Sequence, residues 1–174
     1  VISDGGLTVT AGAGVTNARI TLSGDNTYTG GTTIGSGVTM RVGNSGGAAL
    51  AGTTGSILGD ITNNGALIFD RTNNLTSSNS ISGTGTLQKT GAGTLTLAVA
   101  NTFSGETSIS GTNNAGPGQL ALSNANALSN SVLDLADGNR IAFVLPDATD
   151  YRLGGLRGSA PTLVMGSNSL TLGK

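Results

Sequence analysis

Short runs of alternating apolar and polar residues recur along the chain, and Gly or Asn follows soon after each run. A period of two places every second side chain on the same face of an extended strand, so the runs predict short β-strands joined by tight turns. No window of 11 or more residues keeps a helical period, because Gly, Asn and Thr clusters interrupt it. The predicted strands cover residues 7–9, 20–22, 32–34, 38–42, 66–69, 86–88, 95–97, 119–122, 132–135, 163–165 and 170–172.

An internal repeat narrows the architecture. Residues 20–34 match residues 95–109 at a constant offset of 75, and the two copies extend over about 20–50 and 95–128. The matched positions are Leu22 and Leu97, Asn26 and Asn101, Tyr28 and Phe103, Gly30 and Gly105, and Ile34 and Ile109. A unit of this length is too long for one solenoid coil, which typically takes about 20–30 residues, so each unit should contain several coils.

The repeat predicts an all-β solenoid of roughly seven or eight stacked coils over residues 1–174, with equivalent residues of the two copies at equivalent places. Leu22, Ile34, Leu95, Leu97, Phe103 and Ile109 should point inward. A β-sandwich is the alternative, because it also uses short alternating strands, but it has no need of long-period self-similarity.

Composition removes several kinds of chemistry. The 174 residues contain no Cys and no His, so disulfides, thiolate or imidazole metal ligands and His-activated nucleophiles are excluded. The 8 basic residues are scattered and only 3% of residues are aromatic, which argues against a nucleic-acid partner. The longest aliphatic or aromatic run, residues 141–145, is too short to span a membrane. Without an initiator Met, the chain is expected to be a segment of a longer polypeptide whose further coils cover both ends.

Two carboxylate pairs, Asp134 with Asp137 and Asp147 with Asp150, are the closest candidates for acid–base chemistry. Alternation places Asp134 on the outside of a strand, and Asp137 precedes Gly in a predicted turn. Asp147 and Asp150 could form a small ligand site with the adjacent Tyr and Arg, but a loop held by an Arg–Asp contact is favoured. No catalytic, cofactor-binding or metal-binding residue is therefore assigned, and no cofactor is expected.

The Gly-rich stretch around Lys89 lacks phosphate-loop spacing and a following helix, so it is interpreted as strand turns. Calcium-binding nonapeptide repeats are not supported either, because the required Asp is missing. Tyr28 and Phe103 occupy the same repeat position and could be exposed adhesive groups or shared packing groups. The packing role is favoured, because equal spacing in a repeat is what a shared buried site produces.

The stretch ISGTGTLQKTGAGTLTLAVANTFSGETSI at 81–109 resembles the autotransporter-associated β-strand repeat of type V secreted proteins of Gram-negative bacteria. Residues 59–76 are similar to the segment that leads into this repeat, and residues 20–42 are similar to a second copy. The resemblance implies a right-handed parallel β-helix, export through the outer membrane and display on the cell surface. Val99 and Glu106 depart from the first copy, which has Gly24 and Gly31 there. Residues 140–157 resemble the repeat poorly and are the expected place for a protruding loop or another feature atypical of the family.

The sequence therefore predicts a non-enzymatic stalk within an autotransporter passenger, which aids export and presents other segments at the bacterial surface. The expected partners are adjoining β-helix coils and the C-terminal translocator β-barrel of the same polypeptide. The alternative is an adhesin or self-association module that binds a host glycan or another passenger. A polysaccharide-active enzyme is the third and weakest hypothesis.

Overall fold

The computed structural model describes residues 1–44, 52–110, 118–135, 140–146, 149–158 and 163–173. All regular structure in these ranges is β-strand, and they contain no helix long and apolar enough to cross a membrane. The strands are β1 (Leu7–Val9), β2 (Ala18–Leu22), β3 (Thr32–Ile34), β4 (Val38–Val42), β5 (Ile61–Asn63), β6 (Ala66–Asp70), β7 (Leu75–Ser77), β8 (Ile81–Ser82), β9 (Thr86–Thr90), β10 (Thr94–Leu97), β11 (Thr107–Ile109), β12 (Gln119–Leu122), β13 (Leu128–Asp134), β14 (Ile141–Phe143), β15 (Asp150–Arg157) and β16 (Ser169–Leu172).

The strands form three parallel sheets around a common interior. The long sheet has eight strands in the order β16-β15-β13-β11-β9-β6-β4-β2. The first short sheet has the order β1-β3-β5-β8, and the second short sheet has the order β14-β12-β10-β7. Every pair described is parallel, which excludes the antiparallel β-sandwich.

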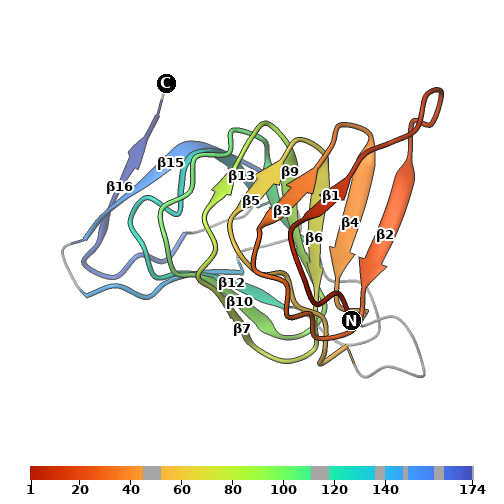
Figure 1. Cartoon of the computed structure of the whole chain (residues 1–174). Coiled ribbons are helices and arrows are strands. Elements are labelled where there is room, and N and C mark those ends of the chain that lie inside the picture. Colours follow the sequence, from red (N-terminus) through yellow and green to blue (C-terminus); the bar gives the residue numbers. More distant parts are fainter. Residues whose placement is uncertain (45–51, 111–117, 136–139, 147–148, 159–162, 174) are drawn as a thin grey trace.

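The turn of the solenoid from β6 to β9 contributes a strand to each of the three sheets. From β6 in the long sheet the chain passes to β7 in the second short sheet and β8 in the first short sheet. It then returns to the long sheet at β9, which pairs with β6. About seven turns stack along one axis, and within the described residues most of them have strands in the long sheet and in only one of the two short sheets. Strands β2 and β16 lie at opposite ends of the stack (Figure 1). The predicted parallel β-solenoid is therefore confirmed.

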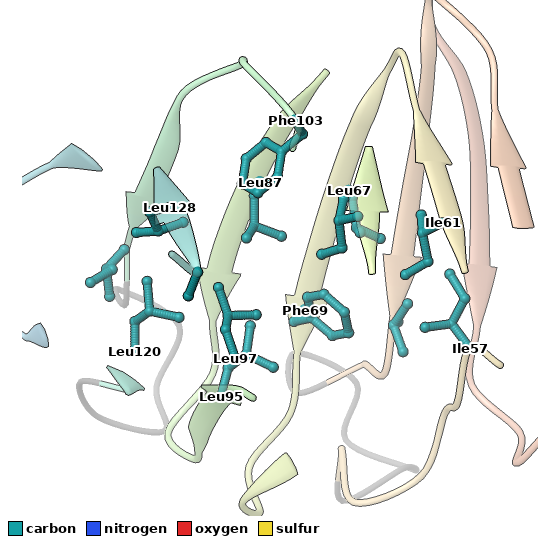
Figure 2. Packing of buried hydrophobic residues seen from close by; sticks show 14 of the residues in the cluster. Ile57, Ile61, Leu67, Phe69, Leu87, Leu95, Leu97, Phe103, Leu120 and Leu128 are labelled. Atoms are coloured by element: carbon teal, nitrogen blue, oxygen red, sulfur yellow. The ribbon is translucent and has the colours of Figure 1, made fainter. Parts of the chain in front are cut away.

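Parallel register aligns inward side chains into columns that run along the axis. In the second short sheet, Leu95 pairs with Leu75 on one side and Leu120 on the other, and Leu120 pairs with Ile141. Figure 2 shows Leu95 and Leu120 among the aliphatic and aromatic side chains that fill the space between the sheets. Burying each of them contributes roughly 1.5–3 kcal/mol. The six residues predicted to point inward are all buried: Leu22, Ile34, Leu95, Leu97, Phe103 and Ile109.

One predicted strand near the C-terminal end is not formed. Residues 163–165 form no strand, although Leu163 and Met165 pack against the core while Val164 is exposed. The side chains there alternate in burial, although the segment pairs with no strand of the described residues. Residues 140–157, the expected place for a protruding loop or another feature atypical of the family, contain β14 and β15, which pair with β12 and β13. Residues 147–148 in that region lie outside the described residues.

Candidate functional site

Asn26 is a buried polar residue that joins three successive coils. Its Oδ1 accepts a hydrogen bond from the Ile2 backbone N–H at 2.8 Å, in the preceding coil. Its Nδ2 donates to the Ser56 carbonyl oxygen at 2.9 Å, in the following coil, and to the Gly24 carbonyl oxygen at 3.2 Å. The amide therefore satisfies backbone groups at a corner where no strand ladder does so.

Asn101 repeats this arrangement in the second copy. Its Oδ1 accepts from the Ile81 N–H at 2.9 Å, and its Nδ2 donates to the Ala127 carbonyl at 2.9 Å and the Val99 carbonyl at 3.3 Å. Ile81 and Ala127 are fully buried, so these bonds are sheltered from water. We call the side chains of Asn26 and Asn101 the asparagine clamps.

The paired aromatic residues are both interior packing groups. Tyr28 is 0% exposed and Phe103 is 1% exposed. The Tyr28 hydroxyl shares a 2.6 Å hydrogen bond with the hydroxyl of Thr32. Phe103 has no hydroxyl, and the corresponding Thr107 bonds instead to Ser131 at 2.8 Å. The partner change keeps each buried threonine hydroxyl satisfied.

Gly30 and Gly105 allow one coil to lie against the backbone of the coil before it. A Cβ added at Gly30 would lie 2.6 Å from the Gly6 nitrogen, and one added at Gly105 would lie 2.0 Å from the Gly85 oxygen. Backbone cannot yield to such contacts without moving the coil. Glycine is therefore required at both repeat positions by close stacking.

The prediction that the two copies occupy equivalent places on the solenoid is wrong with respect to the sheet. Leu22 lies in the long sheet on β2, whereas Leu97 lies in the second short sheet on β10. Ile34 lies in the first short sheet, whereas Ile109 lies in the long sheet. From β2 the chain returns to the long sheet at β4, β6 and β9 before it reaches β10. The 75-residue offset therefore corresponds to three full turns of the solenoid and a further step to the next sheet. Both copies nevertheless keep the hydrogen bonds of the asparagine clamp to the preceding and following coils.

Two buried cations were not anticipated from the sequence. Lys89 is 2% exposed, and its Nζ donates to the carbonyl oxygens of Thr90 and of Gly91, the latter at 2.9 Å. Burial lowers the pKa of Lys89 to about 8, and the nearby Asp70 carboxylate opposes that shift. A Cβ at Gly118 would lie 2.6 Å from this Nζ, so the ammonium group fills a corner between coils.

Arg71 has a similar role in the preceding coil. Its guanidinium donates to the carbonyl oxygens of Gly55 and Thr53, and its Nε donates to Asn73 Oδ1 at 3.0 Å. Burial lowers its pKa, and attraction to Asp25 opposes the change. The sequence pattern that could have indicated burial of Lys89 is its position two residues after the inward-pointing Leu87, because alternate residues of a strand lie on the same face.

The candidate acid–base residues Asp134 and Asp150 make ion pairs and hydrogen bonds at the surface. Asp134 accepts from Arg157 at 3.0 Å, and Arg157 also contacts Glu106 at 2.5 Å, so the three form a surface ion network across neighbouring coils. Asp150 lies 3.9 Å from Arg152 and accepts hydrogen bonds from β16 hydroxyls. Asp137 and Asp147 lie outside the described residues. Within the described ranges, no three carboxylates are grouped so as to hold a metal ion.

The comparisons with known proteins agree with the repeat. The family model of the passenger-associated-transport-repeat matches residues 18–40 and 87–111, which contain segments of both copies. The adhesin BmaC autotransporter of Brucella suis biovar 1 (strain 1330) is 56% identical over 62 residues. That match covers 36% of this chain and 2% of the relative, so the chain spans a very small fraction of that protein. No solved structure matches the chain.

These matches fall on the same coil-joining positions that the structure brings out. Asn26, Tyr28 and Gly30 lie in the first matched range, and Asn101, Phe103 and Gly105 lie in the second. The two repeat matches and the identity to an autotransporter support an autotransporter passenger with repeats, and they indicate export across the outer membrane with surface display or secretion.

Proposed function

We propose that this segment is a non-enzymatic β-helical stalk whose coil stacking supports export of its parent passenger. The observation that carries the proposal is the pair of asparagine clamps, each of which ties one coil to both neighbours within a matched transport repeat. The charged side chains support a non-enzymatic role. Asp70, Asp134 and Glu106 bind arginines of other coils, the buried Arg71 donates to a backbone carbonyl of another coil, and the buried Lys89 donates to a carbonyl of its own coil, so these charged groups make structural contacts.

The mechanism follows from the order in which contacts become available. Asn101 can bond to one neighbouring coil, that of Ile81 or that of Ala127, as soon as that coil has formed, but its bond to the other coil exists only after the other coil has docked. Each docked coil adds ladder hydrogen bonds and apolar burial to the stack. Folding outside the cell would therefore oppose backward movement of the chain, and the translocator domain of the same polypeptide is the proposed partner.

The test compares inward and outward substitutions within β10 of the full-length parent. Leu95→Asp with Leu97→Asp places two carboxylates at positions that are each 1% exposed, which should cost several kcal/mol per charge. Thr94→Ser with Thr96→Ser changes partly exposed residues of the same strand and is the matched control.

The measurement is the protease-accessible fraction of passenger on intact cells. We expect the leucine variant to lose most of its surface display and the threonine variant to keep it. Normal display of a leucine variant whose stack is shown to be unfolded would reject a role for folding in export.

A second candidate function is adhesion, because the relative from Brucella suis bears the name adhesin. A stalk tolerates polar changes on its outer face, whereas an adhesive face does not. Cell-binding assays with outward substitutions that preserve folding therefore separate the two roles.

A further inference from the structure

The outer face of the long sheet is hollowed where β2, β4 and β6 lie side by side. Parallel register places Arg19, Thr39 and Ala66 in one outward row, and Thr21, Arg41 and Ile68 in the next. The two arginines therefore stand on opposite corners of a small square, and the two threonines occupy the other corners. These six side chains line a hollow of about 400 Å³.

Each arginine has a neighbouring acceptor, and that of Arg41 is the closer and more buried of the two. Arg41 Nη1 lies 2.5 Å from a carboxylate oxygen of Asp70, which is fully buried, while 34% of the Arg41 side chain remains exposed. Arg19 Nε donates to Asn17 Oδ1 at 3.4 Å. A buried acid that orients a half-exposed arginine reduces the conformational entropy that a ligand would otherwise have to remove.

The lining combines three kinds of contact. Guanidinium groups bind carboxylates and sulfates through paired N–H donors. Threonine hydroxyls both donate and accept, as sugar hydroxyls do. Ala66 and Ile68 supply an apolar floor for the C–H face of a sugar ring, and Ile68 is 9% exposed. The lining includes no aromatic side chain on which a nucleic-acid base could stack.

We propose that this hollow is a binding site for an acidic saccharide, one or two sugar units that carry a carboxylate or sulfate group. Its volume lies near the lower end for ligand pockets, which suits a unit of that size better than a folded partner. The open, polar geometry implies a weak single site, with a Kd of roughly millimolar order. This inference goes beyond the proposed stalk role and does not depend on it.

The test titrates the 174-residue chain with four probes, followed by amide chemical shifts. 3′-Sialyllactose carries a carboxylate, a heparin-derived disaccharide carries sulfates, lactose is the neutral control and inorganic phosphate is the control for a bare anion. Arg19→Gln removes one exposed arginine from the hollow. Arg152→Gln removes an arginine of the same charge from β15, where its side chain is 63% exposed, and is the matched control.

We expect saturable binding of at least one acidic sugar, with shifts centred on β2, β4 and β6 and little response to lactose or phosphate. Arg19→Gln should weaken this binding at least about tenfold, the loss of a charge-assisted contact, while Arg152→Gln leaves it unchanged. Equal loss in both variants, equal binding of lactose or phosphate, or no binding of either acidic sugar would overturn the proposal. The bound probe distinguishes a carboxylate from a sulfate ligand.

Discussion

Replacing Asn101 with alanine removes the three hydrogen bonds of one asparagine clamp. The Ile81 N–H and the Ala127 carbonyl belong to fully buried residues, so water cannot take the place of the lost amide. Each buried group left without a partner costs about 1–3 kcal/mol, so Asn101→Ala should destabilise these coils by roughly 2–6 kcal/mol.

The first copy provides an internal comparison. Asn26→Ala removes the same three bonds, but its partners Ile2 and Ser56 are only half-buried. Water can reach these partners after the substitution, and the expected loss is only about 1 kcal/mol. Asn101→Asp nearly preserves shape and the acceptor to Ile81, but it sets a charge against two carbonyl oxygens. Asn101→Asp should be at least as destabilising as Asn101→Ala. Because aspartate keeps the volume of asparagine, that result would attribute the loss to hydrogen bonding and not to volume.

Urea denaturation followed by circular dichroism gives the overall loss, and hydrogen exchange locates it. Solenoids can unfold one region at a time, so exchange of the Ile81 amide is the more direct readout. We expect this amide to lose protection in Asn101→Ala and to keep it in Asn26→Ala. Equal destabilisation by the two alanine variants, or unchanged protection at Ile81, would refute the assignment of the energy to sheltered clamp bonds.

Three further substitutions test other regions of the stack. The pKa of Lys89 is about 8 in the folded chain against 10.5 for the ordinary group, so the unfolded chain binds more protons between these values and stability should rise with pH across this window. In Lys89→Met this rise should disappear, as measured by urea midpoints from pH 7 to pH 11. Tyr28→Phe leaves the buried Thr32 hydroxyl without its 2.6 Å partner and should lower stability by about 1 kcal/mol in thermal or urea unfolding. Gly105→Ala should cost several kcal/mol, because its Cβ meets backbone at 2.0 Å, whereas Gly12→Ala, with 3.8 Å to its nearest neighbour, should be neutral in the same assay.

The inward residues were predictable because alternation is a local property. Leu95 and Leu97 flank one outward threonine, and the structure buries both leucines. The sheet to which each copy belongs was not predictable, because turn length varies along the chain. Ile81 and its clamp lie 20 positions apart, whereas Asn26 and Ser56 lie 30 apart. The number of residues between two copies therefore does not determine how far one copy is rotated from the other about the solenoid axis.

Lys89 illustrates a different limit. Its phase in β9 matches the buried Leu87, but lysine is rarely buried, and the sequence-based prediction ended this strand at residue 88 and interpreted the Gly-rich stretch around Lys89 as turns. The carbonyls that accept its hydrogen bonds belong to the next two residues, Thr90 and Gly91, and the hydrophobicity pattern gives no sign that they turn toward the ammonium group. The hollow at β2, β4 and β6 was missed for another reason. Its arginines and threonines are brought together by parallel register between strands that are far apart in the sequence.

The one-sheet displacement between the repeats bears on how such a protein can change length during evolution. If a module worked on only one sheet, a duplication or deletion in the gene would have to span a whole number of turns. Here the asparagine clamp, the aromatic residue and the glycine occupy different corners of the solenoid in the two copies. A duplication or deletion that begins at one corner and ends at another can therefore preserve the stack. Each 75-residue unit adds about 16 Å to the axis at the usual strand spacing. Reach from the cell can thus vary with copy number, independently of the rotational phase of each copy.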